Sequence, residues 1–375
     1  MRGKLGGVLA FILLCTGILY ARYTFQIYKE EVFLGEELIE NKEEVKNLIR
    51  DEIEKRDELQ TNVVLENVQE PVFGNVVVQD EVEEPEERMQ DRYYYDQLNS
   101  YAKIIYARLT NEYENMKTGT AKIDFGKEFN SVMQTEQGKK EIEDSFQAAL
   151  NALFYDRPEY FFLESTKMFF YTETTTRGTK TTYETYIAPA ENENYLKDIF
   201  ENEIDVNVAI RRMENITKDI VLKAGASKYD IIKNAHDWIV MNTQYDETLS
   251  EPNIRDIYGV FENGVAVCAG YANAFKYILD RAGISCIYVP GEATNEKGTE
   301  SHAWNYVKID DKWYFVDCTW DDPIITGATY LDNKIRTEYF LKGRNTVENS
   351  HVPNNNSYGE ISFEWPELYE LDYKK

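Results

Sequence analysis

Three residues of this sequence carry side chains suited to nucleophilic catalysis: Cys268, His302 and Asp317. In such chemistry a thiolate attacks a carbonyl carbon, an imidazole takes and returns the proton, and a carboxylate fixes the tautomer of the imidazole. Each residue, taken singly, could equally be an ordinary structural residue. Their chemistry therefore depends on whether the predicted elements bring the three side chains together.

Cys268 is predicted to open a helix. The chain breaks at residues 263–264, and after the cysteine apolar residues recur at helical spacing up to a stop at Gly283. The unpaired N–H groups and the positive pole at the start of a helix stabilise a thiolate. The next two residues are Ala and Gly, which leaves room for a substrate, and the backbone N–H of Cys268 is the first candidate for an oxyanion donor.

His302 and Asp317 are predicted to lie on one face of a β-hairpin. Two strand-like runs flank a tight turn at residues 310–311. Counting outward from this turn places His302 opposite Thr319 and makes Asp317 its diagonal neighbour, at about 7 to 8 Å between backbones. On the same count Cys318 points to the other face, where we expect an inert core thiol.

Composition excludes several classes of function. The net charge is −26, so we expect no nucleic-acid partner, because phosphate binding requires concentrated Lys and Arg. The cysteines are too few and too widely spaced for a disulfide scaffold. The sequence contains no CxxC pair of the kind that indicates a zinc site. The cysteines are Cys15, Cys268, Cys286 and Cys318. We expect no metal site and no cofactor, with weak calcium binding by the acidic surface left as an alternative.

The N-terminus has the pattern of an export signal. Arg2 and Lys4 precede an uncharged run from Leu5 to Tyr20. We expect residues 1–28 to be a membrane anchor, or a signal segment if they are cleaved; bulky residues near the end of the run favour the anchor. The expected location is a single-pass cell-membrane protein with an extracytoplasmic catalytic domain, or a secreted protein after cleavage.

The remainder divides into four predicted regions. Residues 29–90 are rich in Glu and Asp and indicate an acidic stalk or linker, and residues 91–194 indicate an accessory α+β region with two helices and a long β-hairpin. Residues 195–345 form the predicted catalytic domain, and residues 346–375 a C-terminal extension. Within the catalytic domain, His236 lies on the apolar face of a helix and is expected to be structural.

Several motifs in order along the chain closely resemble the bacterial transglutaminase-like superfamily. The resemblance covers roughly residues 195–345. The motifs are the stretch 258–275 around Cys268, Ala-Gly-Ile at 282–284, His-Ala-Trp-Asn at 302–305 and Trp-Tyr-Phe-Val-Asp-Cys-Thr-Trp-Asp-Asp-Pro at 313–323. Upstream, His-Asp-Trp-Ile-Val at 236–240 and Tyr-Asp at 245–246 also fit the lead-in helix of that family.

This resemblance implies an α+β, papain-like fold in which a Cys-bearing helix packs on an antiparallel sheet. It implies Cys268 as nucleophile, His302 as general base and acid, and Asp317 as its orienting partner. Trp304, Tyr271 and Trp320 are expected to bind substrate or support the site.

The expected function is that of a thiol acyltransferase or peptidase acting on amide bonds of proteins or peptides. Hydrolysis and amine transfer both remain open. The alternative is a catalytically silent surface binding or scaffold module with the same fold.

Overall fold

The computed structural model describes residues 92–225, 227–296, 298–322, 336–354 and 357–375. These residues fall within one compact unit of the chain. The predicted N-terminal segment and acidic stalk, residues 1–90, lie outside the described residues. Among the helices described, none is both long enough and apolar enough to cross a bilayer.

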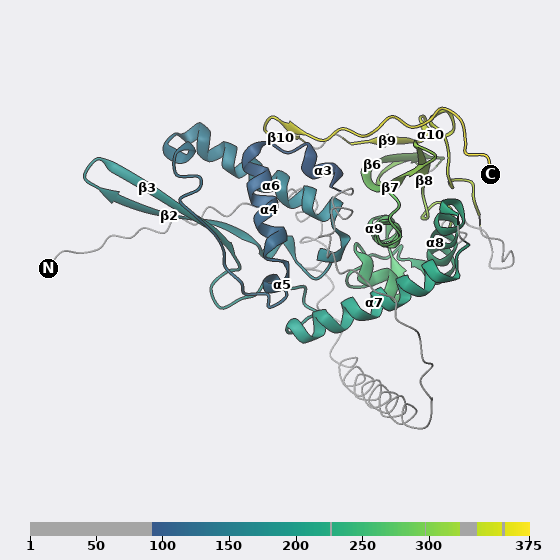
Figure 1. Ribbon diagram of the computed structural model, residues 1–375, viewed down its shortest axis with the longest axis horizontal. Coiled ribbons are helices and arrows are strands. Elements are labelled where there is room, and N and C mark those ends of the chain that lie inside the picture. The colour runs from purple at the N-terminus through teal and green to yellow at the C-terminus, as the bar shows by residue number, and fades with distance from the viewer. Residues whose placement is uncertain (1–91, 226, 297, 323–335, 355–356) are drawn as a thin grey trace, which may run out of the picture. The chain divides into compact units, whose positions relative to one another are not determined.

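The described chain contains both helices and strands (Figure 1). The α-helices are α3 (Tyr93–Asp96), α4 (Ser100–Asn111), α5 (Tyr113–Met116), α6 (Glu136–Asp156), α7 (Glu203–Lys223), α8 (Lys228–Asn242), α9 (Cys268–Arg281) and α10 (Arg344–Val347). Short 3₁₀ turns occur at Val132–Gln134, Pro158–Tyr160 and Ser165–Lys167, and a π-helical turn at Gly259–Asn263.

The strands form four sheets. They are β1 (Ile123–Gly126), β2 (Phe169–Arg177), β3 (Lys180–Ala188), β4 (Gln244–Tyr245), β5 (Val265–Ala266), β6 (Cys286–Asn295), β7 (Gly298–Ile309), β8 (Lys312–Val316), β9 (His351–Pro353), β10 (Ser357–Tyr358) and β11 (Ile361–Ser362). The largest sheet has the order β8-β7-β6-β9, with every neighbouring pair antiparallel. The smaller sheets are β1-β3-β2, β4-β5 and β10-β11.

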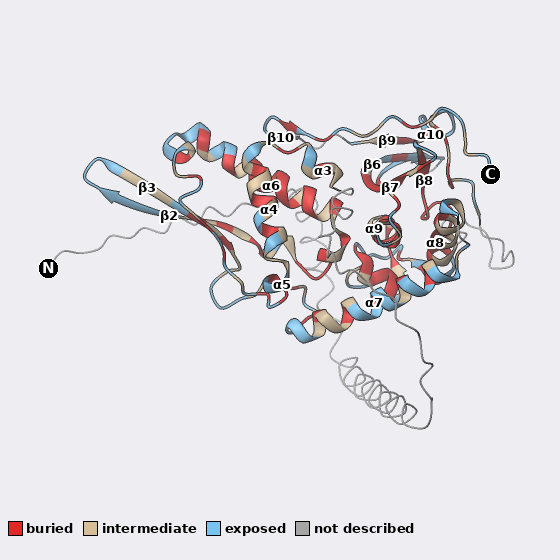
Figure 2. Cartoon of the chain, in the orientation of Figure 1, coloured by how far each residue is buried: buried red, intermediate tan, exposed pale blue. Residues whose placement is uncertain are grey.

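Helix α9 packs against β6 and β7 of the four-stranded sheet, and α8 packs against α9 (Figure 1). The apolar residues that predicted this helix, among them Phe275, Ile278 and Leu279, are fully buried. Figure 2 accordingly colours most of α9 as buried. Burying a side chain of this size stabilises the fold by about 1.5–3 kcal/mol. The α+β class with a helix on an antiparallel sheet is therefore confirmed.

The start of α9 is held by the loop before the π-helical turn. The Val267 N–H donates to the carbonyl oxygen of Ile254 at 2.9 Å. A Cβ at Gly270 would lie 2.6 Å from that same oxygen, so only glycine fits there. The expectation that Gly270 leaves room for a substrate was wrong, because the space beside it is filled by the protein's own backbone.

The predicted hairpin is present as β7 and β8. Its register runs from Ile309↔Lys312 to Asn305↔Val316, as counted from the sequence. Asp310 and Asp311 have φ values of 50° and 59°, the left-handed pair that a two-residue hairpin turn requires.

The ladder between β7 and β8 ends before the residues of interest, which corrects part of the count. Beyond Val316 the chain leaves β8, so His302 does not face Thr319; its partner is Gly291 of β6. The physical reason is a turn capped by Asp317, whose Oδ1 accepts the N–H groups of Thr319 and Trp320 at 2.8 and 3.1 Å.

The accessory region contains the two helices and the hairpin predicted for it, as α4, α6 and β2-β3. Helix α6 also contacts β6 of the large sheet. Tyr155 of α6 stacks on Tyr288 of β6, with ring centroids 5.1 Å apart. The domain borders proposed from the sequence stay predictions, but this contact brings an accessory side chain to the sheet that carries His302.

Candidate active site

Cys268 is the first residue of α9 and is partly exposed. It packs against a small buried cluster of Ala272, Tyr288 and Ala303, beside Tyr155. The N–H groups of the first helical turn have no acceptor inside the helix, and the helix dipole is positive at this end. The thiol therefore lies where a negative charge is stabilised and where a reagent can reach it.

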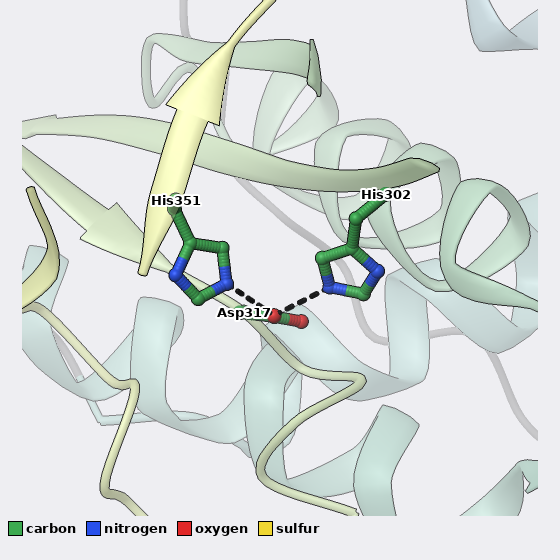
Figure 3. A group of neighbouring side chains, drawn as sticks. All are labelled: His302, Asp317 and His351. Carbon is green, nitrogen blue, oxygen red and sulfur yellow. Dashed lines mark hydrogen bonds and ion pairs between the residues drawn. The ribbon is translucent and has the colours of Figure 1, made fainter. Parts of the chain in front are cut away.

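His302 lies on β7 with its ring buried between the thiol and a carboxylate. Its Nε2 is 2.8 Å from Oδ2 of Asp317. The other ring nitrogen, Nδ1, points away from Asp317 (Figure 3). A hydrogen bond between His302 and Cys268 raises the pKa of the imidazole. Because Nε2 contacts Asp317, Nδ1 is the nitrogen that faces the sulfur.

The charges of this site favour a protonated imidazole. Burial lowers the pKa of His302, but the Asp317 charge and the hydrogen bonds to Asp317 and Cys268 outweigh it and raise this pKa to about 10. Burial by itself raises the pKa of Asp317, whereas its pairing with His302 and His351 brings the pKa well below the ordinary range. At neutral pH the imidazole is thus held as a cation, the form that stabilises a thiolate.

Asp317, Asp321 and Asp322 lie close together in sequence, and each serves a different partner. Asp317 accepts from His302, while Asp321 Oδ2 lies 3.0 Å from Nε2 of His236. Asp322 Oδ2 accepts from the Tyr271 hydroxyl at 2.6 Å. The turn after β8 therefore supplies three buried carboxylates with three separate tasks.

The three residues expected to bind substrate or support the site are buried. Trp304 and Trp320 pack around His302, with centroid distances of 6.1 and 5.6 Å. Tyr271 is fully buried, and its hydroxyl is used by Asp322. Trp304 and Trp320 thus lie beside His302, and Tyr271 contacts the turn after β8. These positions suit a supporting role, and substrate contact by any of the three residues stays a prediction.

His236 lies fully buried on α8, and both of its ring nitrogens contact carboxylates. Its Nδ1 is 2.9 Å from Asp237 and its Nε2 is 3.0 Å from Asp321. Burial lowers the pKa of His236, but these two carboxylates outweigh burial and raise it. Both nitrogens are occupied, which agrees with the structural role expected from the sequence.

Cys286 and Cys318 are both buried. Burial, reinforced by the charges of Asp317 and Asp321, raises the pKa of the Cys318 thiol well above its usual range. A thiol held protonated is a poor nucleophile. Among the described cysteines, Cys268 alone is partly exposed.

His351 belongs to the site but was missed by the sequence analysis. It lies on β9, and its Nε2 is 3.3 Å from Oδ2 of Asp317 (Figure 3). The chain contains only three histidines, so a third one could have been examined for this reason alone. No periodic pattern or motif marks it, and the segment that carries it was assigned to a C-terminal extension.

His302, Asp317 and His351 also satisfy the spacing of a metal site, with their donor atoms within 4.8 Å of one another. However, Oδ2 of Asp317 already contacts both imidazoles directly, and the group is buried. An ion would have to displace the protons that these contacts share. We therefore interpret the group as a hydrogen-bonded cluster.

Comparisons with known proteins find matches to part of this chain. A family model described as the Transglutaminase-like superfamily matches residues 214–318. Kyphoscoliosis peptidase of Mus musculus is 23% identical over 171 residues and that of Homo sapiens 25% over 174, in each case 39% of this chain and 26% of the relative. A solved structure described as a TGase is 18% identical with a TM-score of 0.30, covering 46% of this chain and 50% of that one.

The match to the transglutaminase-like superfamily model covers residues 214–318, a region that includes α9 with Cys268 at its start and the strands β6 and β7 on which α9 packs. Residues 214–318 therefore resemble a transglutaminase-like core domain. The chain spans about a quarter of the length of the curated relatives it matches.

Proposed function

We propose that the protein is a thiol enzyme that attacks amide bonds of proteins or peptides through Cys268. The observation that carries the proposal is the continuous contact from the partly exposed thiol to His302 and from His302 to Asp317. A buried carboxylate on one nitrogen and a thiol on the other is what a thiol nucleophile with a proton-transfer partner requires.

In the first step the Cys268 thiolate attacks the amide carbonyl carbon and forms a C–S bond. His302 transfers its Nδ1 proton to the departing amine nitrogen, and the C–N bond breaks to leave a thioester. The backbone N–H groups at the start of α9 are the candidates for stabilising the oxyanion. Asp317 keeps the imidazole in the orientation that directs Nδ1 at the sulfur.

In the second step a new nucleophile resolves the thioester. Water or an amine attacks the carbonyl carbon, His302 takes its proton, and the C–S bond breaks to regenerate the thiolate. Water gives hydrolysis of a peptide or deamidation of a side chain. An amine gives transfer or cross-linking, and both outcomes use the same residues.

We also propose that the protein acts outside the cytoplasm, held by its N-terminal segment. The support is the sequence pattern alone, Arg2 and Lys4 followed by the apolar run to Tyr20. Protease treatment of intact cells, followed by immunodetection of the region after residue 91, tests this location. Full protection in intact cells with digestion after lysis would contradict it.

The reaction is tested with the full chain, a mixture of peptides and a labelled primary amine. Mass spectrometry then scores cleavage, a deamidation shift and amine incorporation. We expect at least one of these products from the wild type and none from Cys268→Ala. Cys286→Ala is the matched control, because it removes a thiol that lies buried in β6.

The silent-scaffold alternative has a distinct outcome in the same experiment. If neither the wild type nor Cys286→Ala modifies any peptide, iodoacetamide labelling at pH 6 decides. Cys268 should react far faster than the two buried thiols when it is held as a thiolate. Equal, slow labelling of all three would overturn the enzyme proposal.

A further inference from the structure

His351 is brought to the triad by a short strand from the region after the catalytic motifs. Strand β9 pairs with β6 through Gly291↔Pro353 and Ala293↔His351. A Cβ at Gly291 would collide with the Trp304 ring and the Val352 carbonyl oxygen, so the absence of a side chain there lets β9 approach. The close approach places the His351 ring beside Asp317 (Figure 3).

The two carboxylate oxygens of Asp317 are used differently. Oδ1 accepts two backbone N–H groups, those of Thr319 and Trp320. Oδ2 contacts both imidazoles, with His302 at 2.8 Å and His351 at 3.3 Å. Because Oδ1 already fixes the carboxylate in place, His351 is not needed to hold Asp317; it shares the oxygen that faces His302.

The protonation of His351 follows from its surroundings. Burial lowers its pKa, and the His302 charge adds to this, so that the pull of Asp317 is outweighed and the ring is neutral. A neutral ring that faces a carboxylate must carry its proton on Nε2. Its Nδ1 then accepts from the Ser350 hydroxyl, 2.8 Å away, in which case this hydroxyl does not donate to the Val347 carbonyl oxygen at 3.1 Å.

The His351 ring is fixed by aromatic neighbours. Its centroid lies 4.4 Å from Trp320, 4.6 Å from Phe315 and 5.0 Å from Trp304. The ring is almost completely buried. A buried, packed N–H donor in fixed contact with a carboxylate exerts a constant electrostatic effect on that carboxylate.

We propose that His351 is a positioning residue of the thiol site: its Nε2–H donates to Oδ2 of Asp317, competes with His302 for this oxygen, and limits how tightly His302 holds its proton. Each donor that a carboxylate accepts stabilises its negative charge and weakens its attraction for the next donor. His302 must release its proton to the leaving amine, so a weaker grip favours that step.

Other ionisable groups also act on the His302–Asp317 pair and contribute to the proton affinity of His302. Cys268 on α9 and His351 on β9 contact it directly. Tyr245 on β4, Tyr339 and Cys318 lie within the electrostatic range of Asp317, and Glu300 on β7 acts on Tyr245. The variants below change only Cys268 and His351 among these groups, and Cys268 is replaced in all of the titrated proteins, so a shift between them reports on His351.

Histidine-selective ¹³C and ¹⁵N labelling of the full chain tests the proposal, since only three histidines contribute signals. His236→Gln, His302→Gln and His351→Gln assign the signals. The titration is run in a Cys268→Ala background, because removing the coupled thiol makes the midpoint that of His302. This readout needs no substrate, so it stands apart from the proposed function that it extends.

We expect His351 to show the neutral Nε2–H pattern between pH 7 and 9, and His351→Leu to raise the His302 midpoint by roughly half a pH unit or more. His351→Gln should restore most of the shift, because its amide can donate to the same oxygen. An unchanged or lowered His302 midpoint in a folded His351→Leu protein would overturn the proposal. If this variant does not fold, an Nδ1–H pattern for His351 in the otherwise native chain overturns it instead.

Discussion

Two buried histidines of this molecule are each paired with an aspartate, but only one of them meets a thiol. His302 contacts Asp317 through Nε2 and leaves Nδ1 for Cys268. His236 contacts carboxylates through both nitrogens. In both cases burial lowers the pKa and the carboxylate partners outweigh it and raise the pKa, so neither property distinguishes a base from a structural residue. The difference lies in what the second nitrogen faces.

The largest effect is expected for removal of the Cys268 sulfur, because contact with this thiol distinguishes His302 from His236. Cys268→Ala removes the nucleophile and should lower the rate of product formation by about 10⁴-fold or more, to the background of the assay. Cys318→Ala should change the rate less than a few-fold, because that thiol is buried and held protonated. Peptide turnover measured by mass spectrometry checks both. A fully active Cys268→Ala protein would contradict the role of Cys268 as the nucleophile, and with it the functional distinction between His302 and His236.

Exchanging each histidine for glutamine separates the two regions directly. His302→Gln should lower turnover by about 10³-fold, since proton transfer is lost. His236→Gln should leave turnover within about tenfold but lower the free energy of unfolding by about 3 kcal/mol, because it leaves the buried Asp321 carboxylate without its charged partner. Turnover and urea unfolding are measured on the same preparations. The interpretation fails if His236→Gln costs activity as severely as His302→Gln does.

The ion pair of the His302 region also predicts a pH dependence of stability. The pKa of His302 is raised from 6.5 to about 10, so its contribution is complete below pH 6.5 and is lost as the pH rises towards 10. The pKa of Asp317 is lowered from 3.8, so the same contribution is also lost as the pH falls below that value. Urea unfolding from pH 5 to 9.5 should show wild type losing its advantage over His302→Gln as the pH rises. A constant difference across this range would contradict the ion pair.

The smallest effect is expected at Asp322. Its carboxylate accepts from the Tyr271 hydroxyl, whereas Asp317 and Asp321 of the same turn contact histidines. Tyr271→Phe removes the buried hydroxyl that donates to Asp322 Oδ2. The free energy of unfolding should fall by about 1–3 kcal/mol, with little change in turnover. Thermal unfolding and the peptide assay check this. A loss of turnover larger than tenfold in a folded protein would mean that Tyr271 acts on substrate as well.

The elements around Cys268 and His302 were predictable because their signals are local. Chain breaks and apolar spacing located the start of α9, and the two aspartates of the turn set the register of β7 and β8. The end of that ladder was not predictable, because it depends on the Asp317 side chain turning back onto the backbone two and three residues later.

His351 and Tyr155 could not be placed from the sequence, because contacts between distant segments determine their positions. His351 reaches Asp317 only through the pairing of β9 with β6, a three-residue strand without a periodic pattern. Tyr155 lies at the end of α6, and the apolar spacing of this helix does not indicate that it packs against β6. Export and membrane attachment depend on residues 1–28, outside the described part of the chain, and stay predictions.

The pairing of β9 with β6 has a consequence for the order in which the molecule matures. During synthesis α9, β7 and β8 are translated before residue 351. The nascent chain therefore contains Cys268, His302 and Asp317 while the neighbour that shares Asp317 has yet to be made. Under the proposed role of His351, the site reaches its final proton affinity only after β9 has been translated and has paired with β6.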